Sequence, residues 1–227
     1  MTATEAALLE PSPPVPPVLA AAAGPRRPRN GPARVIADLD KPNAPHFCAG
    51  AAMRPDSVLT VNQLLLMLAL AEQAPEGPFV EVGVYKGGSA WHLAAIARLQ
   101  GRTLHLFDTF AGIPYHDEID NHPTGDFGDA SLGDVRAAIP DARFHVGVFP
   151  DTLPPDLTGV AFVHADCDQY RSVEAVIEHL VPRLAGGGVI VFDDYGCTRG
   201  ATRAVDEALA GQIHMMNSGR CYYRRGD

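Results

Sequence analysis

Short apolar runs alternate with amphipathic segments from about residue 57 to residue 225, and this alternation limits the folds that the chain can adopt. The apolar runs predict strands over residues 78–85, 103–108, 143–149, 159–166 and 186–194. The segments between them predict helices over residues 60–73, 89–99, 130–139, 170–184 and 200–210. Because strands that alternate with helices form parallel sheets covered on both faces, we predict an α/β fold with a doubly wound, mostly parallel sheet. Two weaker runs, residues 212–216 and 221–225, predict an antiparallel C-terminal hairpin.

The N-terminal stretch differs in composition from the rest of the chain. Residues 1–45 hold ten of the 20 prolines, together with a run of alanines. Such a segment buries too little apolar surface to fold, so we predict a disordered tail over residues 1–45 and one folded domain over residues 46–227. Glu5 and Glu10 stand where a signal peptide carries basic residues, which argues against secretion.

Charge and cysteine content exclude several classes of protein. The formal net charge is −9, whereas a protein that binds nucleic acid presents a basic face to the phosphates. No apolar run reaches the length of a transmembrane helix. The cysteines form no CxxC pair and are expected to be reduced thiols, so we expect a cytoplasmic protein without nucleic-acid or membrane partners. The sequence leaves open whether the protein is a homo-oligomer.

The first two predicted strands end in residues suited to a nucleoside-type cofactor. Gly83 and Gly87, in "EVGVYKGGS", allow a tight turn and the close approach of a ligand. Asp108 ends the second strand, where an acidic side chain commonly accepts hydrogen bonds from ribose hydroxyls. The alternatives are a plain strand–helix turn at the glycines and, for Asp108, an N-cap of the segment that follows it. The candidate cofactor-binding residues at these strand ends are Glu81, Gly83, Tyr85, Gly87, Asp108 and Thr109.

A long polar loop separates the second and third predicted strands. Residues 111–130 hold five acidic residues and the two histidines His116 and His122. Loops of this length inside a compact domain are usually functional or disordered, and we favour a substrate lid whose acidic side chains bind hydroxyl groups. His116 and His122 are candidate proton acceptors, with surface positions as the alternative.

Carboxylates follow the fourth and fifth predicted strands. Asp166 and Asp168 follow the fourth strand, and the adjacent pair Asp193 and Asp194 ends the fifth in "VIVFDDYG". If these strands are neighbours, like charges converge at one edge of the sheet and raise one another's pKa. A hard divalent cation such as Mg²⁺ removes this conflict. The alternative is that Asp168 and Asp194 cap the helices that follow them.

Five stretches carry a resemblance to a known family: "FVEVGVYKGGSAWHLA", "LHLFDTFAGIP", "VGVFPDTLP", "DCDQYRSVEAVIEHLVPRLAGGGVIVFDDYG" and "GATRAVDE". Over roughly residues 57–210, the sequence resembles the macrocin O-methyltransferases, which use S-adenosylmethionine and Mg²⁺ to methylate sugar hydroxyls in bacterial antibiotics. The resemblance implies a Rossmann-like class I methyltransferase fold. It also implies that Glu81, Gly83, Ser89 and Asp108 bind the methyl donor and that Asp166, Asp193 and Asp194 bind Mg²⁺.

The expected reaction is transfer of a methyl group to a hydroxyl of a small molecule, most simply a sugar. The sulfonium of the donor already activates the methyl group, whereas the acceptor hydroxyl must lose a proton. Mg²⁺ lowers the pKa of a hydroxyl that it coordinates, and Asp166 is the candidate general base. A metal-dependent catechol or phenol O-methyltransferase is the closest alternative. A nicotinamide oxidoreductase is disfavoured because the G-x-G-x-x-G fingerprint is absent, and a non-catalytic binding protein because the carboxylates are intact.

Overall fold

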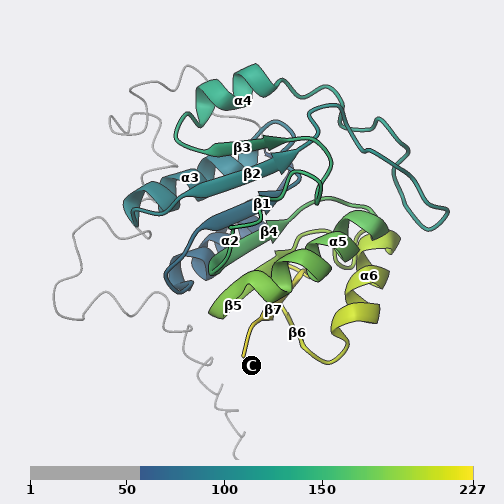
Figure 1. Cartoon of the computed structure of the whole chain (residues 1–227). Helices are drawn as coiled ribbons and strands as arrows, with labels where there is room; N and C mark the ends of the chain where they lie inside the picture. The colour runs from purple at the N-terminus through teal and green to yellow at the C-terminus, as the bar shows by residue number, and fades with distance from the viewer. Residues whose placement is uncertain (1–56, 227) are drawn as a thin grey trace, which may run out of the picture.

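In the part of the chain that the computed structural model describes, residues 57–226, seven strands form one sheet (Figure 1). The spatial order is β3-β2-β1-β4-β5-β7-β6. The strands are β1 (Phe79–Val82), β2 (Leu104–Asp108), β3 (Arg143–Val146), β4 (Val160–Ala165), β5 (Leu184–Phe192), β6 (Ile213–Met215) and β7 (Cys221–Arg224). Strands β1 to β5 pair in parallel, and β7 runs antiparallel to both β5 and β6. The predicted parallel sheet with an antiparallel C-terminal hairpin is therefore confirmed.

The predicted helices are present with small changes at their ends. They are α2 (Val61–Gln73), α3 (Gly88–Leu99), α4 (Leu132–Ala138), α5 (Tyr170–Leu180) and α6 (Arg199–Leu209). Thr60 caps α2 as expected, in a capping box with Gln63. The prediction that the fourth predicted helix, α5, extends to residue 184 was wrong, because a 3-10 turn with Pro182 at its start follows Leu180. Proline lacks the N–H that would continue the α-helical hydrogen bonding.

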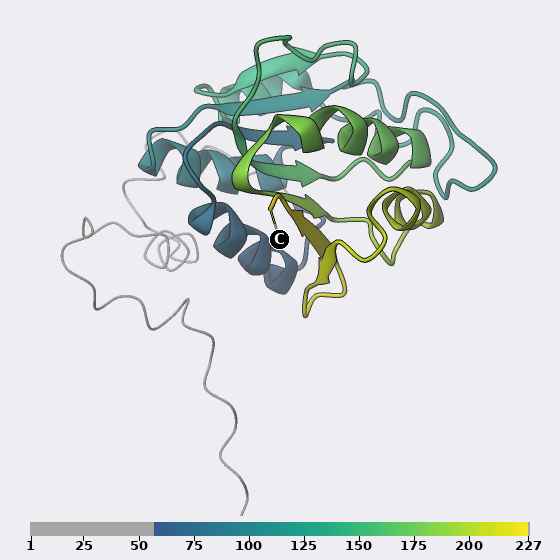
Figure 2. The same cartoon turned by 60° about the horizontal axis from the view of Figure 1, so that its bottom comes forward.

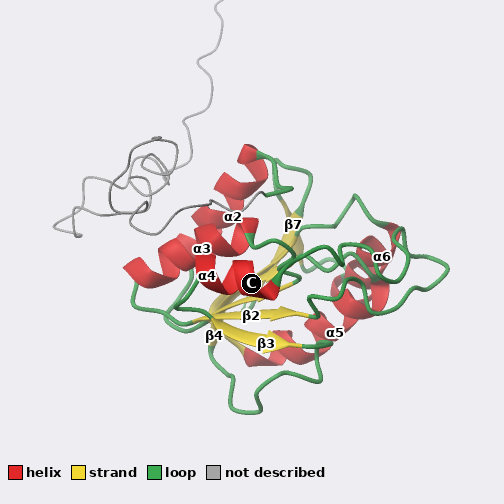
Figure 3. Ribbon diagram, turned by 90° about the horizontal axis from the view of Figure 1, so that it is seen from above, coloured by secondary structure: helices red, strands yellow, loops and turns green. Residues whose placement is uncertain are grey.

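Helices cover both faces of the sheet. Helices α2 and α3 pack on one face, and α5 and α6 pack on the other (Figures 1 and 3). Along β1 and β5, alternate residues enter the two cores: Phe79 and Val189 face α2 and α3, whereas Val80 and Ile190 face α5 and α6. This burial on both faces explains why the strands are continuous apolar runs in the sequence.

The order of the strands creates a crevice at their carboxyl ends. The chain builds the sheet outward from β1 to β3 and then returns to β4 on the other side of β1, so the direction of winding changes between β1 and β4. Ligands of doubly wound proteins bind at this switch point. Residues 111–130, which connect β2 to α4, extend beyond this edge (Figures 1 and 2).

Gly83, at the end of β1, is required by the close approach of the two strand ends. Its φ is +88°, and a Cβ at this position would lie 1.6 Å from the backbone oxygen of Asp166. Only glycine fits this space, because it has no Cβ and tolerates positive φ.

Two expectations fall partly or wholly outside the described residues. The predicted tail over residues 1–45 lies there entirely, and so does the start of the predicted domain at residue 46.

Within residues 57–226, no helix combines the length and the apolar character needed to span a bilayer.

Candidate active site

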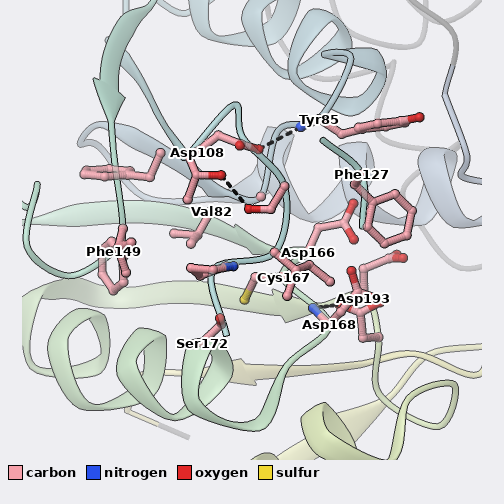
Figure 4. A pocket seen from close by; sticks show the side chains of 18 of the residues that line it. Val82, Tyr85, Asp108, Phe127, Phe149, Asp166, Cys167, Asp168, Ser172 and Asp193 are labelled. Carbon is pink, nitrogen blue, oxygen red and sulfur yellow. Dashed lines mark hydrogen bonds between the residues drawn. The ribbon is translucent and has the colours of Figure 1, made fainter. Parts of the chain in front are cut away.

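A cavity of about 310 Å³ lies at the carboxyl edge of the sheet, over the switch point. It is lined by the ends of β1, β2, β4 and β5, by the segment after β3 and by part of the 111–130 loop. Figure 4 shows Asp108 on one side of the cavity and Asp166, Asp168 and Asp193 on the other. The carboxylates that follow β4 and β5 thus meet at one edge of the sheet, as the sequence predicted, and Asp108 lines the same pocket.

Asp108 organises the loop after β1. Its Oδ2 accepts hydrogen bonds from the backbone N–H groups of Val84 (2.6 Å) and Tyr85 (2.9 Å), and its Oδ1 accepts one from Phe110 (2.7 Å). Bonds from N–H groups to a carboxylate are among the stronger hydrogen bonds in proteins. Asp108 therefore holds the turn that borders the cavity while lining the cavity itself.

The other candidate cofactor-binding residues divide into two sets. Gly83, Tyr85 and Thr109 line the cavity. Gly87 is the N-cap of α3 at φ 84°, where a Cβ would contact Val135, so its conformation serves the packing of α4. Glu81 and Ser89 are buried, and neither lines the cavity.

Three carboxylates form a compact cluster at the other side of the cavity. Asp166, Asp193 and Asp194 each offer an oxygen, and these oxygens lie within 4.8 Å of one another. Asp193 and Asp194 are buried and Asp166 is half-buried. A set of three carboxylate oxygens at this separation fits a hard divalent cation, since such ions take oxygen ligands.

The carboxylates of this cluster differ in their electrostatic surroundings. Burial and the charge of Asp194 raise the pKa of Asp166 well above its ordinary value, and burial and the charge of Asp168 do the same for the pKa of Asp194. Burial also acts on Asp193, but His164 and Arg220 outweigh it and lower the pKa of that carboxyl. The cluster therefore carries unrelieved repulsion at two of its three positions.

Asp168 lies beside the cluster and lines the cavity. Its backbone N–H donates to Asp194 Oδ2 at 2.8 Å. Burial and the charge of Asp166 raise its pKa to about 7. The alternative that Asp168 and Asp194 cap the following helices was wrong, because Thr198 caps α6 and the N-cap residue of α5, Gln169, makes no side-chain cap.

The 111–130 loop supplies that missing cap. Asp120, which is buried, accepts a hydrogen bond from the first backbone N–H of α5, at Tyr170 (2.8 Å). The neighbouring Asn121 accepts one from Arg199 at the start of α6 (2.8 Å). The loop is therefore anchored on the N-terminal ends of two helices that the sequence places far away.

The side chains that this loop brings to the cavity are apolar and aromatic. Ile113, Pro114, Tyr115 and Phe127 line it, and the ring of Phe127 packs edge-to-face on Tyr85 with centroids 5.4 Å apart. The expectation of an acidic lid was wrong. The acidic residues lie elsewhere: Asp117 pairs with Arg171, Asp126 with His122 and Asp129 with Lys86, Asp120 caps α5, and Glu118 is exposed.

The two candidate catalytic histidines are adjacent but outside the residues that line the cavity. His116 is exposed, and its Nδ1 lies 2.8 Å from the backbone oxygen of His122. His122 Nε2 lies 3.7 Å from Asp168 Oδ1. Seen from the cavity, His122 therefore lies behind Asp168, and His116 lies behind His122.

Backbone strain collects around the cavity. In the described part of the chain, the non-glycine residues with positive φ are Tyr85 (49°), Phe110 (50°), Phe127 (61°) and Asp168 (58°). Three of these four line the cavity. Such conformations are uncommon for residues with a Cβ and concentrate at functional sites.

Two residues of the site were missed in the sequence. His164 is fully buried in β4, and Arg220, just before β7, lines the cavity with its guanidinium 3.5 Å from Asp193 Oδ2. His164 had a signal, since it is an ionisable residue at an inward position of an otherwise apolar strand. Arg220 had none, because its place depends on how the C-terminal hairpin returns to β5.

Comparisons with known proteins bear on this site. The family description Macrocin-O-methyltransferase (TylF) matches residues 37–215. The chain belongs to the macrocin O-methyltransferase family. The resemblance seen in the sequence is therefore confirmed, and the carboxylate cluster lies within the matched range.

Named relatives in this family are O-methyltransferases. The chain is 33% identical over 175 residues to the 8-demethyl-8-(2,3-dimethoxy-alpha-L-rhamnosyl)-tetracenomycin-C 4'-O-methyltransferase of Streptomyces olivaceus, covering 69% of this chain and 65% of that protein. It is 29% identical over 184 residues to the Mycinamicin III 3''-O-methyltransferase of Micromonospora griseorubida, covering 69% and 71%. The chain thus spans about two thirds of the length of these relatives.

Solved structures support the fold of the family. The O-methyltransferase NovP matches with a TM-score of 0.65 and 26% identity, over 75% of this chain and 82% of that chain. CalS11, a calicheamicin methyltransferase, matches with a TM-score of 0.60 and 23% identity, over 73% and 79%. The architecture is the Rossmann-like class I methyltransferase fold that the sequence predicted.

Proposed function

We propose that this protein is an S-adenosylmethionine- and Mg²⁺-dependent O-methyltransferase that acts on a hydroxyl of a sugar in a glycosylated natural product. The observation that carries the proposal is the meeting, in one cavity, of the turn held by Asp108 with the cluster of Asp166, Asp193 and Asp194. Membership of the macrocin O-methyltransferase family and the sugar named for its relatives support the same reaction.

In this proposal the two sides of the cavity have separate tasks. Gly83, Tyr85, Asp108 and Thr109 hold the donor, which supplies a methyl group on a sulfonium and carries its own leaving group. Asp166, Asp193 and Asp194 hold Mg²⁺, which lowers the pKa of a coordinated hydroxyl. The protein fixes the angle and separation of the two reactants, which accounts for much of the rate in such a transfer.

We assign the general base to Asp168 rather than to Asp166. Asp166 offers one oxygen to the three-carboxylate cluster, where it would hold the cation. Asp168 lines the same cavity outside the cluster, and its backbone has a positive φ of 58°. His122, 3.7 Å behind Asp168, orients this carboxylate, and His116 holds the backbone of His122. Neither histidine then acts directly on the acceptor.

One observation favours a second acceptor class. The aromatic and apolar side chains that line the cavity, such as Tyr115 and Phe127, would pack on a planar catechol or phenol ring. They would also pack on the C–H face of a sugar ring, because pockets for small molecules are mostly apolar with a few polar groups that fix orientation. The rhamnosyl group in the name of one relative favours a sugar acceptor.

A methyl-transfer assay tests the proposal. The full chain is incubated with radiolabelled S-adenosylmethionine and a panel of rhamnosides, other glycosides and catechols, with EDTA or with Mg²⁺. We expect transfer to a glycoside that EDTA abolishes and Mg²⁺ restores. Transfer to catechols alone would support the second class, and failure of calorimetry to detect donor binding would contradict the proposal as a whole.

A further inference from the structure

His164 forms a buried ion pair inside the sheet. Both His164 and Glu81 are 0% exposed, and His164 Nδ1 lies 2.7 Å from Glu81 Oε1. The two residues are Cα partners in the register of β4 and β1. Their side chains occupy the face that α2 and α3 cover, where neighbouring inward positions such as Phe162 are apolar.

The other nitrogen of His164 points toward the carboxylate cluster. Nε2 has no hydrogen-bond partner among the described residues, and it lies 4.0 Å from Asp193 Oδ1. Asp193 follows β5, the strand that pairs with β4 on the other side. Glu81, His164 and Asp193 thus form a row across β1, β4 and β5.

Basic side chains face both carboxylate oxygens of Asp193. Oδ1 faces His164, Oδ2 faces Arg220 at 3.5 Å, and the backbone N–H of Asp193 donates to Ala165 at 2.9 Å. Asp166 and Asp194 form no ion pair with any described residue. Of the three carboxylates in the cluster, Asp193 is therefore the one whose direction is set by basic neighbours.

We propose that His164 is a positioning residue that orients Asp193 for the divalent cation, with Glu81 fixing the imidazole ring; this rests on the metal-dependent function proposed above. Partners that orient metal-binding side chains contribute to metal affinity even though they do not touch the ion. Stability alone does not explain the pair. A buried ion pair gives little net stability relative to apolar packing, and apolar residues fill the positions around it.

Two substitutions separate positioning from packing. In H164N the shorter amide occupies the place of Nδ1 and keeps a donor for Glu81, but nothing reaches Asp193. In H164Q the longer amide reaches the place of Nε2 and faces Asp193. Binding of Mn²⁺ to the full, metal-free chain is measured by electron paramagnetic resonance, without donor or acceptor. We expect H164N to weaken Mn²⁺ binding by about 10-fold or more, and H164Q to stay close to the unmodified chain.

A matched control uses another buried histidine. His105, in β2 on the other face of the sheet, is 5% exposed and its Nδ1 lies 2.9 Å from His145 Nε2. H105N should lower the melting temperature without changing Mn²⁺ affinity. Equal weakening in H164N, H164Q and H105N would ascribe the effect to packing and overturn the inference, and so would unchanged binding in H164N. Absence of Mn²⁺ binding by the unmodified chain would instead overturn the metal site itself.

Discussion

Asp108 ends one apolar strand, Asp194 follows another, and both line the same cavity, yet their surroundings are opposite. The carboxylate of Asp108 accepts three hydrogen bonds from backbone N–H groups. The carboxylate of Asp194 accepts one, from Asp168, and lies among other carboxylates that raise its pKa. The first arrangement stabilises the folded chain by itself, whereas the second leaves repulsion among its carboxylates unrelieved.

This difference shows that an aspartate at a strand end does not have one structural role. At β2 the backbone N–H groups of a turn donate to the carboxylate, so Asp108 fixes the turn beside the cavity. At β4 and β5 the charges face one another, and in the proposed function a cation relieves their repulsion. Substitutions at the two positions should therefore differ in sign as well as in size.

The largest effect is expected for Asp194→Asn. It removes one charge from the cluster, so methyl transfer should be lost and Mn²⁺ affinity should fall by at least about 100-fold, since a ligand contributes more than the outer partners whose loss costs about 10–100-fold. The metal-free protein should melt at the same or a higher temperature at pH 8, because repulsion is relieved. Metal titrations and melting curves measure both. A strongly destabilised metal-free variant would contradict the comparison.

Asp108→Asn should behave in the opposite way. The amide keeps one oxygen but sets an NH₂ group against backbone donors, so we expect a loss of about 3–4 kcal/mol, given about 1.5–3 kcal/mol for each bond to a charged group. Urea unfolding should show this loss equally with and without Mg²⁺, and calorimetry should show weaker donor binding. A loss that Mg²⁺ reverses would mean that Asp108 belongs with the metal cluster instead.

Acid stability must be separated from the cluster before pH effects are assigned to it. Burial, with His145 and Arg143, lowers the pKa of His105 from 6.5 to about 4, so the folded state holds the ring neutral. Between these values the unfolded chain binds more protons, so stability falls as the pH falls from about 6.5 toward 4. The loss should reach up to about 3 kcal/mol, since one pKa unit is about 1.4 kcal/mol.

This dependence is checked by urea unfolding at several pH values, beside His105→Asn. The variant is less stable throughout, but its stability should change less between pH 6.5 and 4. An unchanged dependence of stability on pH would assign the acid sensitivity to other groups, among them the carboxylates at the carboxyl edge of the sheet.

The smallest effect is expected for Asp120→Ala, which removes the cap that the 111–130 loop provides for α5. Losing a helix cap costs about 0.5–2 kcal/mol. Because this loop lines the cavity with Tyr115 and Phe127, the KM for the acceptor should rise while donor affinity is unchanged. Glu118→Ala, at an exposed residue of the same loop, is the matched control. Equal kinetics in the two variants would show that the anchor does not shape the acceptor site.

Much of the candidate site could be predicted from the sequence, because its carboxylates lie at recognisable positions after apolar runs. Asp166, Asp193 and Asp194 each follow an apolar run, and parallel neighbouring strands bring their ends to one edge. The 111–130 loop shows where this reasoning fails. Its composition predicted an acidic lining, but each acidic side chain found a partner or solvent, and the few apolar residues turned inward. Composition records which residues are present and not which way they face.

The sequence by itself determined the α/β architecture, the strand ends and the family, because hydrophobic periodicity and residue order are properties of the chain. Only the tertiary structure decided which charges are matched. It gave Asp108 three backbone donors, left Asp166 and Asp194 in mutual repulsion, and placed His164 and Arg220 beside Asp193. The physical reason is that burial and electrostatic interaction depend on distance through space, and these partners come from β1, β4 and the C-terminal hairpin, far apart along the chain.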